Sequence, residues 1–408
     1  MPETLEQAVP AEGRVDGRTT GRDRTRTWPT WLKGITPLLL LAMLVAVFLR
    51  FGPLGVFEAA FPPVEELTIQ RITMPAPGEM RVTVVNGGPE PVTIAQVAVD
   101  DATWTHTIDG DRTIDRLEKR VITIPYPWVA GEPHVISLVT STGLTFTADI
   151  AVAAQTPQPD RRYLTTFAML GVYVGVIPVF LGLLWLPFLR SIDRRWLDFF
   201  LSLTIGLLVF LGVDAVAEAF EASARVPGAL QGTSLVLMGI FGTPLAITAI
   251  GHARRNVRTA LFVASLIALA IGLHNLGEGL AIGAAYASGE IALGTFLVLG
   301  FLLHNTTEGL GIVTPLADEK PSLRNLFLLG LLAGAPTIVG AWIGGFSASP
   351  AWTTLFFAVG AGAIIQVVFE LWKLFRRRKD TSLAAPLNAA GVIIGLVIMY
   401  GTGLFVTA

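Results

Sequence analysis

The chain contains no cysteine, and charged residues make up only 15% of its 408 residues. Without cysteine, disulfides and thiolate metal sites are excluded, so a metal site here must use histidine, carboxylate, amide, hydroxyl or methionine ligands. No glycine-rich phosphate loop opens a helix after a strand, which argues against ATP-driven transport within this chain. No Ser-His-Asp arrangement and no pattern typical of nucleic-acid binding is apparent.

Apolar residues make up 52% of the chain, a content that few soluble proteins reach. They gather in runs that exceed the ~20 residues needed to cross a bilayer. The first run, 35–57, predicts a membrane anchor, since a cleavable signal peptide has a shorter apolar core and a small-residue cleavage site. Eight further runs are expected to form helices, at about 163–189, 197–222, 231–251, 259–288, 290–317, 324–348, 352–375 and 384–407.

Residues 58–160 differ in character, because short β-rich runs alternate there with turn sequences such as Asn86-Gly87-Gly88-Pro89. About seven strands in about 100 residues predict a small β-sandwich. His106, His134 and the Asp residues of this part match no metal loop and are expected in solvated turns. The predicted strands are Leu67–Thr73, Met80–Asn86, Val92–Val99, Thr103–Ile108, Arg120–Ile124, His134–Thr140 and Leu144–Val152.

The predicted fold class is an all-α polytopic membrane protein of about nine transmembrane helices with an inserted, extracytoplasmic β-sandwich-like domain. Four parts are expected along the chain. They are a disordered cytoplasmic tail at 1–33, a transmembrane anchor at 34–57, the β-rich domain at 58–160 and an eight-helix domain at 161–408.

The positions of lysine and arginine predict the topology. If the arginine-rich tail is cytoplasmic, the loops on its side carry nearly all other basic residues, whereas the opposite loops after the β-domain carry only Arg225. A multi-pass protein of the cell membrane is therefore expected, with the N-terminus inside and the β-domain and C-terminus outside. The inner loops carry Arg190, Arg194, Arg195, Arg254, Arg255, Arg258, Lys320, Arg324, Arg376, Arg377, Arg378 and Lys379.

One short motif occurs twice, near the middle of two consecutive apolar runs. It reads His274-Asn275-Leu276-Gly277-Glu278-Gly279-Leu280 and then His304-Asn305-Thr306-Thr307-Glu308-Gly309-Leu310. Histidine and glutamate four positions apart share one helix face. The connection between the two runs is short, so the helices are expected to be antiparallel neighbours whose motifs meet at similar depth.

The repeated motif predicts a metal site. A charged residue in hydrocarbon costs at least ~2.5–3.5 kcal/mol, so two matched copies indicate function more than packing. The two histidines and two glutamates could bind one divalent cation, while Asn275 and Asn305 add amide oxygens or orient the carboxylates. Gly277 and Gly279 are expected to loosen the first helix, and Thr306 and Thr307 to bend the second. The alternative is that these polar groups only hydrogen-bond between helices.

Two further polar pairs lie on other predicted helices. Asp214 and Glu218, followed by Glu221, form an acidic stripe toward the outer end of 197–222 that could draw cations inward. Gln366 and Glu370 lie toward the inner end of 352–375 and could line an outlet. The alternatives are an ordinary solvated helix end for the first set and an ion pair of Glu370 with a neighbouring basic residue for the second.

At its two HNxxEG motifs the chain resembles the ZIP (Zrt/Irt-like) family of divalent metal transporters, and within it the GufA-like bacterial branch. The resemblance covers about 163–407 and matches the eight family helices in number and order, with Gly206–Ala219 similar to the second and Ala358–Leu371 to the seventh. It implies that the transport site consists of His274, Asn275, Glu278, His304, Asn305 and Glu308.

The resemblance further implies movement of a divalent metal into the cytoplasm, with zinc as the first candidate and iron, manganese and cadmium as others. No organic cofactor is expected, and the partners would be the metal, the bilayer and a second copy of the chain. Thr337 stands where the sixth family helix usually carries a carboxylate, which bears on whether the site holds one metal or two. Two other functions stay open: an intramembrane metal-dependent hydrolase, and a metal sensor that signals through the β-domain.

The predicted topology can be checked by cysteine labelling, because the chain has no cysteine of its own. A cysteine introduced at Asp109 should react with a membrane-impermeant maleimide in intact cells, since positive-inside asymmetry places the β-domain outside. Reaction only after the membrane is permeabilised would show that the orientation is reversed.

Overall fold

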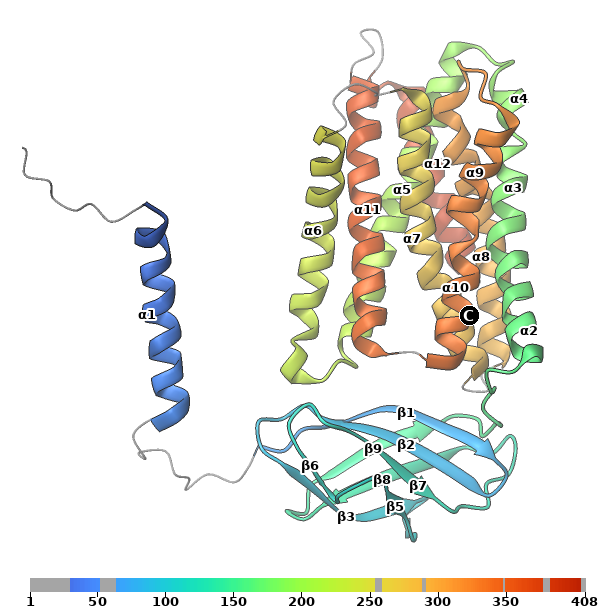
Figure 1. Ribbon diagram of the computed structural model, residues 1–408. Coiled ribbons are helices and arrows are strands. Elements are labelled where there is room, and N and C mark those ends of the chain that lie inside the picture. The colour runs from blue at the N-terminus through green and yellow to red at the C-terminus, as the bar shows by residue number, and fades with distance from the viewer. Residues whose placement is uncertain are drawn as a thin grey trace, which may run out of the picture. The chain divides into compact units, whose positions relative to one another are not determined.

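The computed structural model describes residues 30–51, 64–253, 259–287, 291–347, 349–376 and 382–404. Within these residues the chain is mostly helical, with a separate β-sheet region between residues 67 and 150 (Figure 1). It divides into two units, Met1–Pro62 and Pro63–Ala408.

The first unit contains helix α1, Thr30–Phe51, whose large apolar side chains are exposed. The predicted anchor is thus helical, but it begins inside the stretch that was expected to be tail. Residues 1–29 and 52–63 lie outside the described residues, so the disorder expected of the tail stays a prediction.

The β-domain of the second unit consists of two antiparallel sheets, with strand orders β1-β2-β7-β5 and β4-β3-β8-β9, and β6 pairing with β3. Inward side chains of both sheets, such as Val82, Ile94, Ile122 and Leu138, form one buried core. The strands are β1 Leu67–Ala76, β2 Glu79–Asn86, β3 Val92–Val99, β4 Ala102–Thr103, β5 Thr107–Ile108, β6 Thr113–Ile114, β7 Lys119–Ile124, β8 His134–Thr140 and β9 Thr145–Ile150.

Two sequence-based expectations for this domain are wrong. The predicted strand Thr103–Ile108 is divided between β4 and β5, which belong to different sheets. His134 begins the predicted strand His134–Thr140, but it is buried and not solvated, and its Nδ1 lies 2.7 Å from Oδ2 of Asp100. Asp100 adopts a left-handed conformation with φ of 50°, and its Oδ1 accepts a hydrogen bond from the backbone of Val135 at 2.9 Å. Through these two contacts, the chain reversal after β3 is hydrogen-bonded to β8.

Among the described residues, seven helical segments are long and apolar enough to cross a membrane. An eighth apolar helix, α8, carries the second motif and packs against α3 and α7. The helices of this bundle are α2 Arg161–Gly171, α3 Ile177–Leu183, α4 Leu186–Leu189, α5 Arg194–Ser223, α6 Gly232–Ala253, α7 Ala260–Ala287, α8 Ile291–Val313, α9 Leu323–Gly334, α10 Pro336–Ser347, α11 Pro350–Arg376 and α12 Pro386–Gly403.

Two of the membrane-length segments are interrupted. A π-helical turn, η1 (Val172–Val176), joins α2 to α3, and the segment 323–347 breaks between α9 and α10 just before Pro336. The expectation that Gly277 and Gly279 loosen the first motif helix is wrong, because α7 runs unbroken from residue 260 to residue 287. Irregular backbone inside a membrane bundle is found where protein covers it, and both interruptions pack against other helices.

Glycines in α7 and α10 let these two helices pack with their backbones in contact. A Cβ at Gly279 would overlap the carbonyl oxygen of Thr337, and a Cβ at Gly340 would overlap that of Leu276. Gly283 and Gly344 continue the same pattern toward the end of α10. This is the small-residue packing typical of membrane helices, and it explains why the motif contains a glycine after its glutamate.

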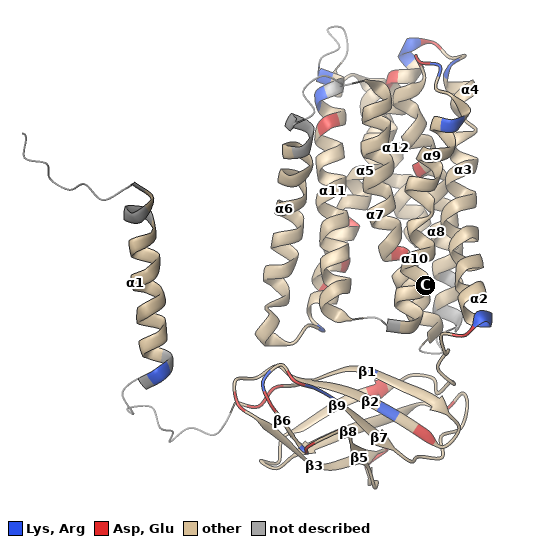
Figure 2. Cartoon of the chain, viewed as in Figure 1, with Lys and Arg blue, Asp and Glu red and all other residues tan. Residues whose placement is uncertain are grey.

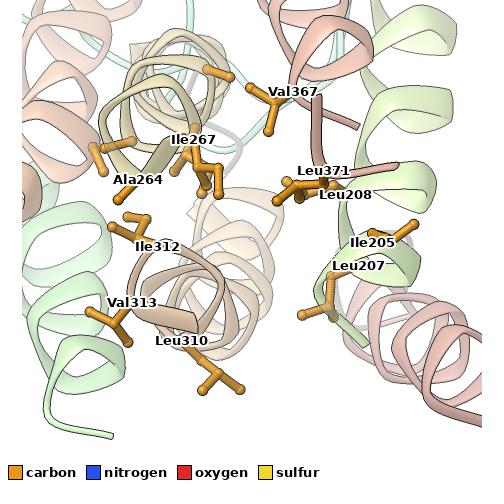
Figure 3. Packing of buried hydrophobic residues seen from close by; sticks show 14 of the residues in the cluster. Ile205, Leu207, Leu208, Ala264, Ile267, Leu310, Ile312, Val313, Val367 and Leu371 are labelled. Atoms are coloured by element: carbon orange, nitrogen blue, oxygen red, sulfur yellow. The ribbon is translucent and has the colours of Figure 1, made fainter. Parts of the chain in front are cut away.

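The interior between the motifs and one end of the bundle is filled with apolar side chains from four helices. They include Leu208 of α5, Ile267 of α7, Ile312 of α8 and Leu371 of α11 (Figure 3). We call that end the basic end because most Lys and Arg of the bundle gather there (Figure 2). It carries Arg190, Arg194, Arg195, Lys320, Arg324, Lys373 and Arg376.

The backbone contact between α7 and α10 predicts that Gly340→Ala is destabilising. The added methyl group must push the helices apart, at a cost of about 1–3 kcal/mol. The matched control is Gly242→Ala in α6, where a Cβ would meet nothing within 4 Å. Thermal unfolding in detergent should show a lower Tm for Gly340→Ala and an unchanged or higher Tm for Gly242→Ala. Equal Tm values would contradict the packing.

The Asp100 contacts predict an acid-sensitive contribution to stability. Burial alone would raise the pKa of Asp100, but hydrogen bonds from Val135, His134 and Tyr126 outweigh it and hold the pKa below the ordinary 3.8. The stabilisation is therefore present above pH 3.8 and is lost as the pH falls through the folded-state pKa. The Tm difference between the protein and its Asp100→Asn variant should shrink below pH 3.8. A difference that stays constant to lower pH would refute this explanation.

Candidate metal centre

Four side chains of the two motifs converge in the centre of the bundle. One ligand atom from each of His274, Glu278, His304 and Glu308 lies within 4.8 Å of the others, and all four residues are buried. Since α7 and α8 are antiparallel neighbours, the i and i+4 positions of each motif face each other across the helix pair. The structure thus brings together the groups that the repeat predicted to meet.

Glu278 is the central group of this cluster. The Nε2 atoms of His274 and His304 both face its Oε1, the first at 3.3 Å and the second in close contact. Its Oε2 accepts a hydrogen bond from Nδ2 of Asn305 at 3.0 Å. One carboxylate therefore links both motifs, and its charge is offset by three nitrogen groups inside an apolar bundle.

Asn275 and Asn305 are oriented by the two interruptions of the bundle. Nδ2 of Asn305 donates to the carbonyl oxygen of Val174 in η1 at 3.0 Å, and Nδ2 of Asn275 donates to that of Ala333 at 3.1 Å, close to the α9–α10 break. Each bond holds the amide by its nitrogen, so the amide oxygen points away from the carbonyl group that the nitrogen contacts. Both Oδ1 atoms are buried and have no hydrogen-bond partner.

The cluster has more acceptors than donors. Both carboxylate oxygens of Glu308, Oδ1 of Asn275 and Oδ1 of Asn305 are buried without a hydrogen-bond partner. Buried acceptors without donors are costly, and a cation is one way to satisfy several of them at once. Imidazole nitrogen with carboxylate and amide oxygen is a donor set that suits zinc and other divalent transition metals.

Thr337 lies beside this region on α10, and its buried Oγ1 also has no hydrogen-bond partner. A Cβ at Gly175 of η1 would overlap that hydroxyl, so the π-helical turn packs directly on the threonine. Among described residues, therefore, α10 adds a hydroxyl and no carboxylate to the neighbourhood of the motifs.

The other predicted residues are not members of the four-residue cluster. Asp214 is exposed, whereas Oε2 of Glu218 is buried without a partner. Glu370 accepts hydrogen bonds from Gln366 at 3.2 Å and Lys373 at 3.1 Å, so its Oε1 is engaged by its own helix. These geometries leave the predicted inlet and outlet as hypotheses.

Sequence reasoning did not identify the carbonyl groups of Val174 and Ala333, which orient the two asparagines. A backbone acceptor carries no residue-type signal. Pro336 and Pro178 were visible hints that helices are interrupted or begin nearby, since proline removes a helical hydrogen bond.

Comparison with known proteins agrees with the motifs. Residues 246–403 match the family model described as ZIP Zinc transporter. The chain is also 30% identical over 152 residues to Zinc transporter ZIPB of Bordetella bronchiseptica, an overlap of 33% of this chain and 48% of that protein. The chain thus spans about half the length of the curated relative that it matches. Residues 246–403, which include both repeated motifs, are therefore the part of the chain that is similar to the ZIP zinc transporter family.

Proposed function

We propose that this protein is a divalent metal transporter and not an enzyme, and that zinc is the leading candidate for its substrate. The observation that carries the proposal is the convergence of the two His-Asn-x-x-Glu-Gly motifs, whose four ligand atoms lie within 4.8 Å of one another. Both motifs lie inside the part of the chain that matches the ZIP family. His274, Asn275, Glu278, His304, Asn305 and Glu308 are the proposed binding residues.

The direction of transport is proposed to be inward, toward the basic end. Basic loops favour the cytoplasmic side of a membrane, so the basic end is taken as cytoplasmic and the β-domain as extracytoplasmic. Asp214 and Glu218 are the proposed inlet carboxylates. On the other side of the site, the apolar cluster around Ile267 and Ile312 must separate before a hydrated ion passes, with Gln366 and Glu370 as the proposed outlet groups.

The two alternatives predicted from sequence have less support. A hydrolase needs a metal-bound water and a substrate-binding feature, and the family match concerns a transporter. A sensor that does not transport would still need the same metal ligands, so binding alone does not separate it from a transporter. Only measurement of metal flux distinguishes the two.

The proposal predicts that Glu278→Gln and Glu308→Gln each reduce zinc uptake into proteoliposomes to the background of empty vesicles. Glutamine preserves volume and hydrogen bonding but removes the negative charge that offsets a dehydrated dication in low dielectric. The matched control is Glu221→Gln on α5, because Glu221 is exposed and lies 4.0 Å from Arg225 at the helix end. Uptake by the control should equal that of the unmodified protein.

Zinc binding by calorimetry and elution as a folded protein in size-exclusion chromatography complete the experiment. Loss of uptake together with loss of binding, in folded variants, supports the site. If both glutamine variants take up zinc as fast as the Glu221→Gln control at matched incorporation, the two motifs do not form the transport site.

A further inference from the structure

The β-domain is firmly attached to the helices that carry the metal centre. The segment after β9 is fastened to β1 by two hydrogen bonds between Thr156 and Met74, at 2.8 and 3.0 Å, immediately before α2 begins. The guanidinium group of Arg71 in β1 donates to the carbonyl oxygens of Gly345 and Phe346 at 3.1 and 2.5 Å. These carbonyls belong to the last turn of α10. The carbonyl groups of a last helical turn lack intrahelical hydrogen-bond partners and interact favourably with a cation.

The helices fall into two packing groups. The site-bearing group contains α2, α3, α7, α8, α9 and α10, in which α7 and α10 share the closest contact. The flanking group contains α5, α6, α11 and α12, and the packing of α11 on α7 is the main contact between the groups. Thr156 and Arg71 both connect the β-domain to the site-bearing group.

A different bond reaches from the β-domain to the flanking group. Oε1 of Glu66 accepts a hydrogen bond from the backbone of Gly228 at 2.6 Å. Gly228 begins η2 (Gly228–Leu230), the connection between α5 and α6. Glu66 is itself held in the domain, since its carbonyl accepts from Gly87 at 2.8 Å. The contact is tight, because a Cβ at Gly228 would lie 2.6 Å from a Glu66 carboxylate oxygen.

We propose that the Glu66–Gly228 contact is a latch, by which the β-domain, moving with the site-bearing group, holds the flanking group at the end opposite the basic end. The proposal rests on the proposed transport function. Alternating access requires rigid groups of helices to move relative to each other around the site. A domain that is fixed to one group and bonded to the other restricts that movement until the second bond breaks. Transport then requires release of Glu66 from Gly228 in each cycle.

The absence of cysteine allows a direct test. Cysteines at Glu66 and Gly228 are joined by a short bifunctional methanethiosulfonate, which dithiothreitol cleaves. Cross-linking should lower the zinc uptake rate roughly tenfold, because conformational steps limit turnover, and reduction should restore it. The matched control joins cysteines at Glu65 and Thr142, whose side chains are 2.8 Å apart inside the β-domain. That cross-link should leave uptake unchanged. Undiminished uptake by the cross-linked 66–228 variant overturns the proposal.

A second measurement is independent of transport. Spin labels at Thr145 of β9 and Thr233 of α6 report the distance between the domain and the flanking group. Glu66→Ala should broaden that distance distribution, and an unchanged distribution overturns the latch. If the unmodified protein takes up no zinc while the labels show release in Glu66→Ala, the transport proposal fails and the latch stands as a property of the fold.

Discussion

The cost of placing ionisable groups inside an apolar helix bundle governs the arrangement around the cluster of two histidines and two glutamates. Glu278 is tolerated there because three nitrogen groups from two helices surround it. Each of those helices also donates an asparagine hydrogen bond to a backbone carbonyl of a neighbouring segment. A buried carboxylate that lost these partners would be expensive in low dielectric. Therefore the depth and rotation of α7 and α8 cannot vary independently. Packing that fixes α7, above all its glycine contact with α10, also fixes the geometry of the cluster.

The helix interruptions extend this dependence to α2, α3 and α9. A carbonyl group inside a regular helix already accepts a backbone hydrogen bond, whereas one at a helix end or in an irregular turn is freer to accept from a side chain. The carbonyls of Val174 and Ala333 lie in or next to irregular turns and accept from Asn305 and Asn275. Each asparagine then presents its oxygen as an acceptor without a donor. The irregular turns thus act indirectly: they bind the nitrogen of each amide and leave its oxygen without a hydrogen-bond partner.

The cluster itself could be predicted from sequence because it depends on the helical period and on one short connection. His and Glu four residues apart must share a face, whatever the rest of the fold does. The roles of Gly277 and Gly279 could not be predicted in the same way, because the same glycine permits either a bend or a close approach. The neighbour decides, and for Gly279 the neighbour is the backbone of Thr337, which is 58 residues away in the chain. The burial of His134 could not be predicted for a similar reason, since its partner Asp100 lies 34 residues earlier in the chain, in a left-handed turn after β3.

At Thr337, close packing restricts which side chain α10 can place beside the two motifs. The threonine meets η1 at Gly175, and its own carbonyl meets α7 at Gly279, so three elements close on one residue. A larger acidic side chain would need room that Gly175 does not leave, because even a Cβ at that glycine would overlap the threonine hydroxyl. The tight contact between η1 and α10 therefore fits a side chain as small as threonine at this position. Among the described residues, Glu218 on α5, in the flanking group, also has a buried carboxylate oxygen without a hydrogen-bond partner. Because Glu218 belongs to the flanking group, its position relative to the two motifs depends on how the two groups of helices pack against each other.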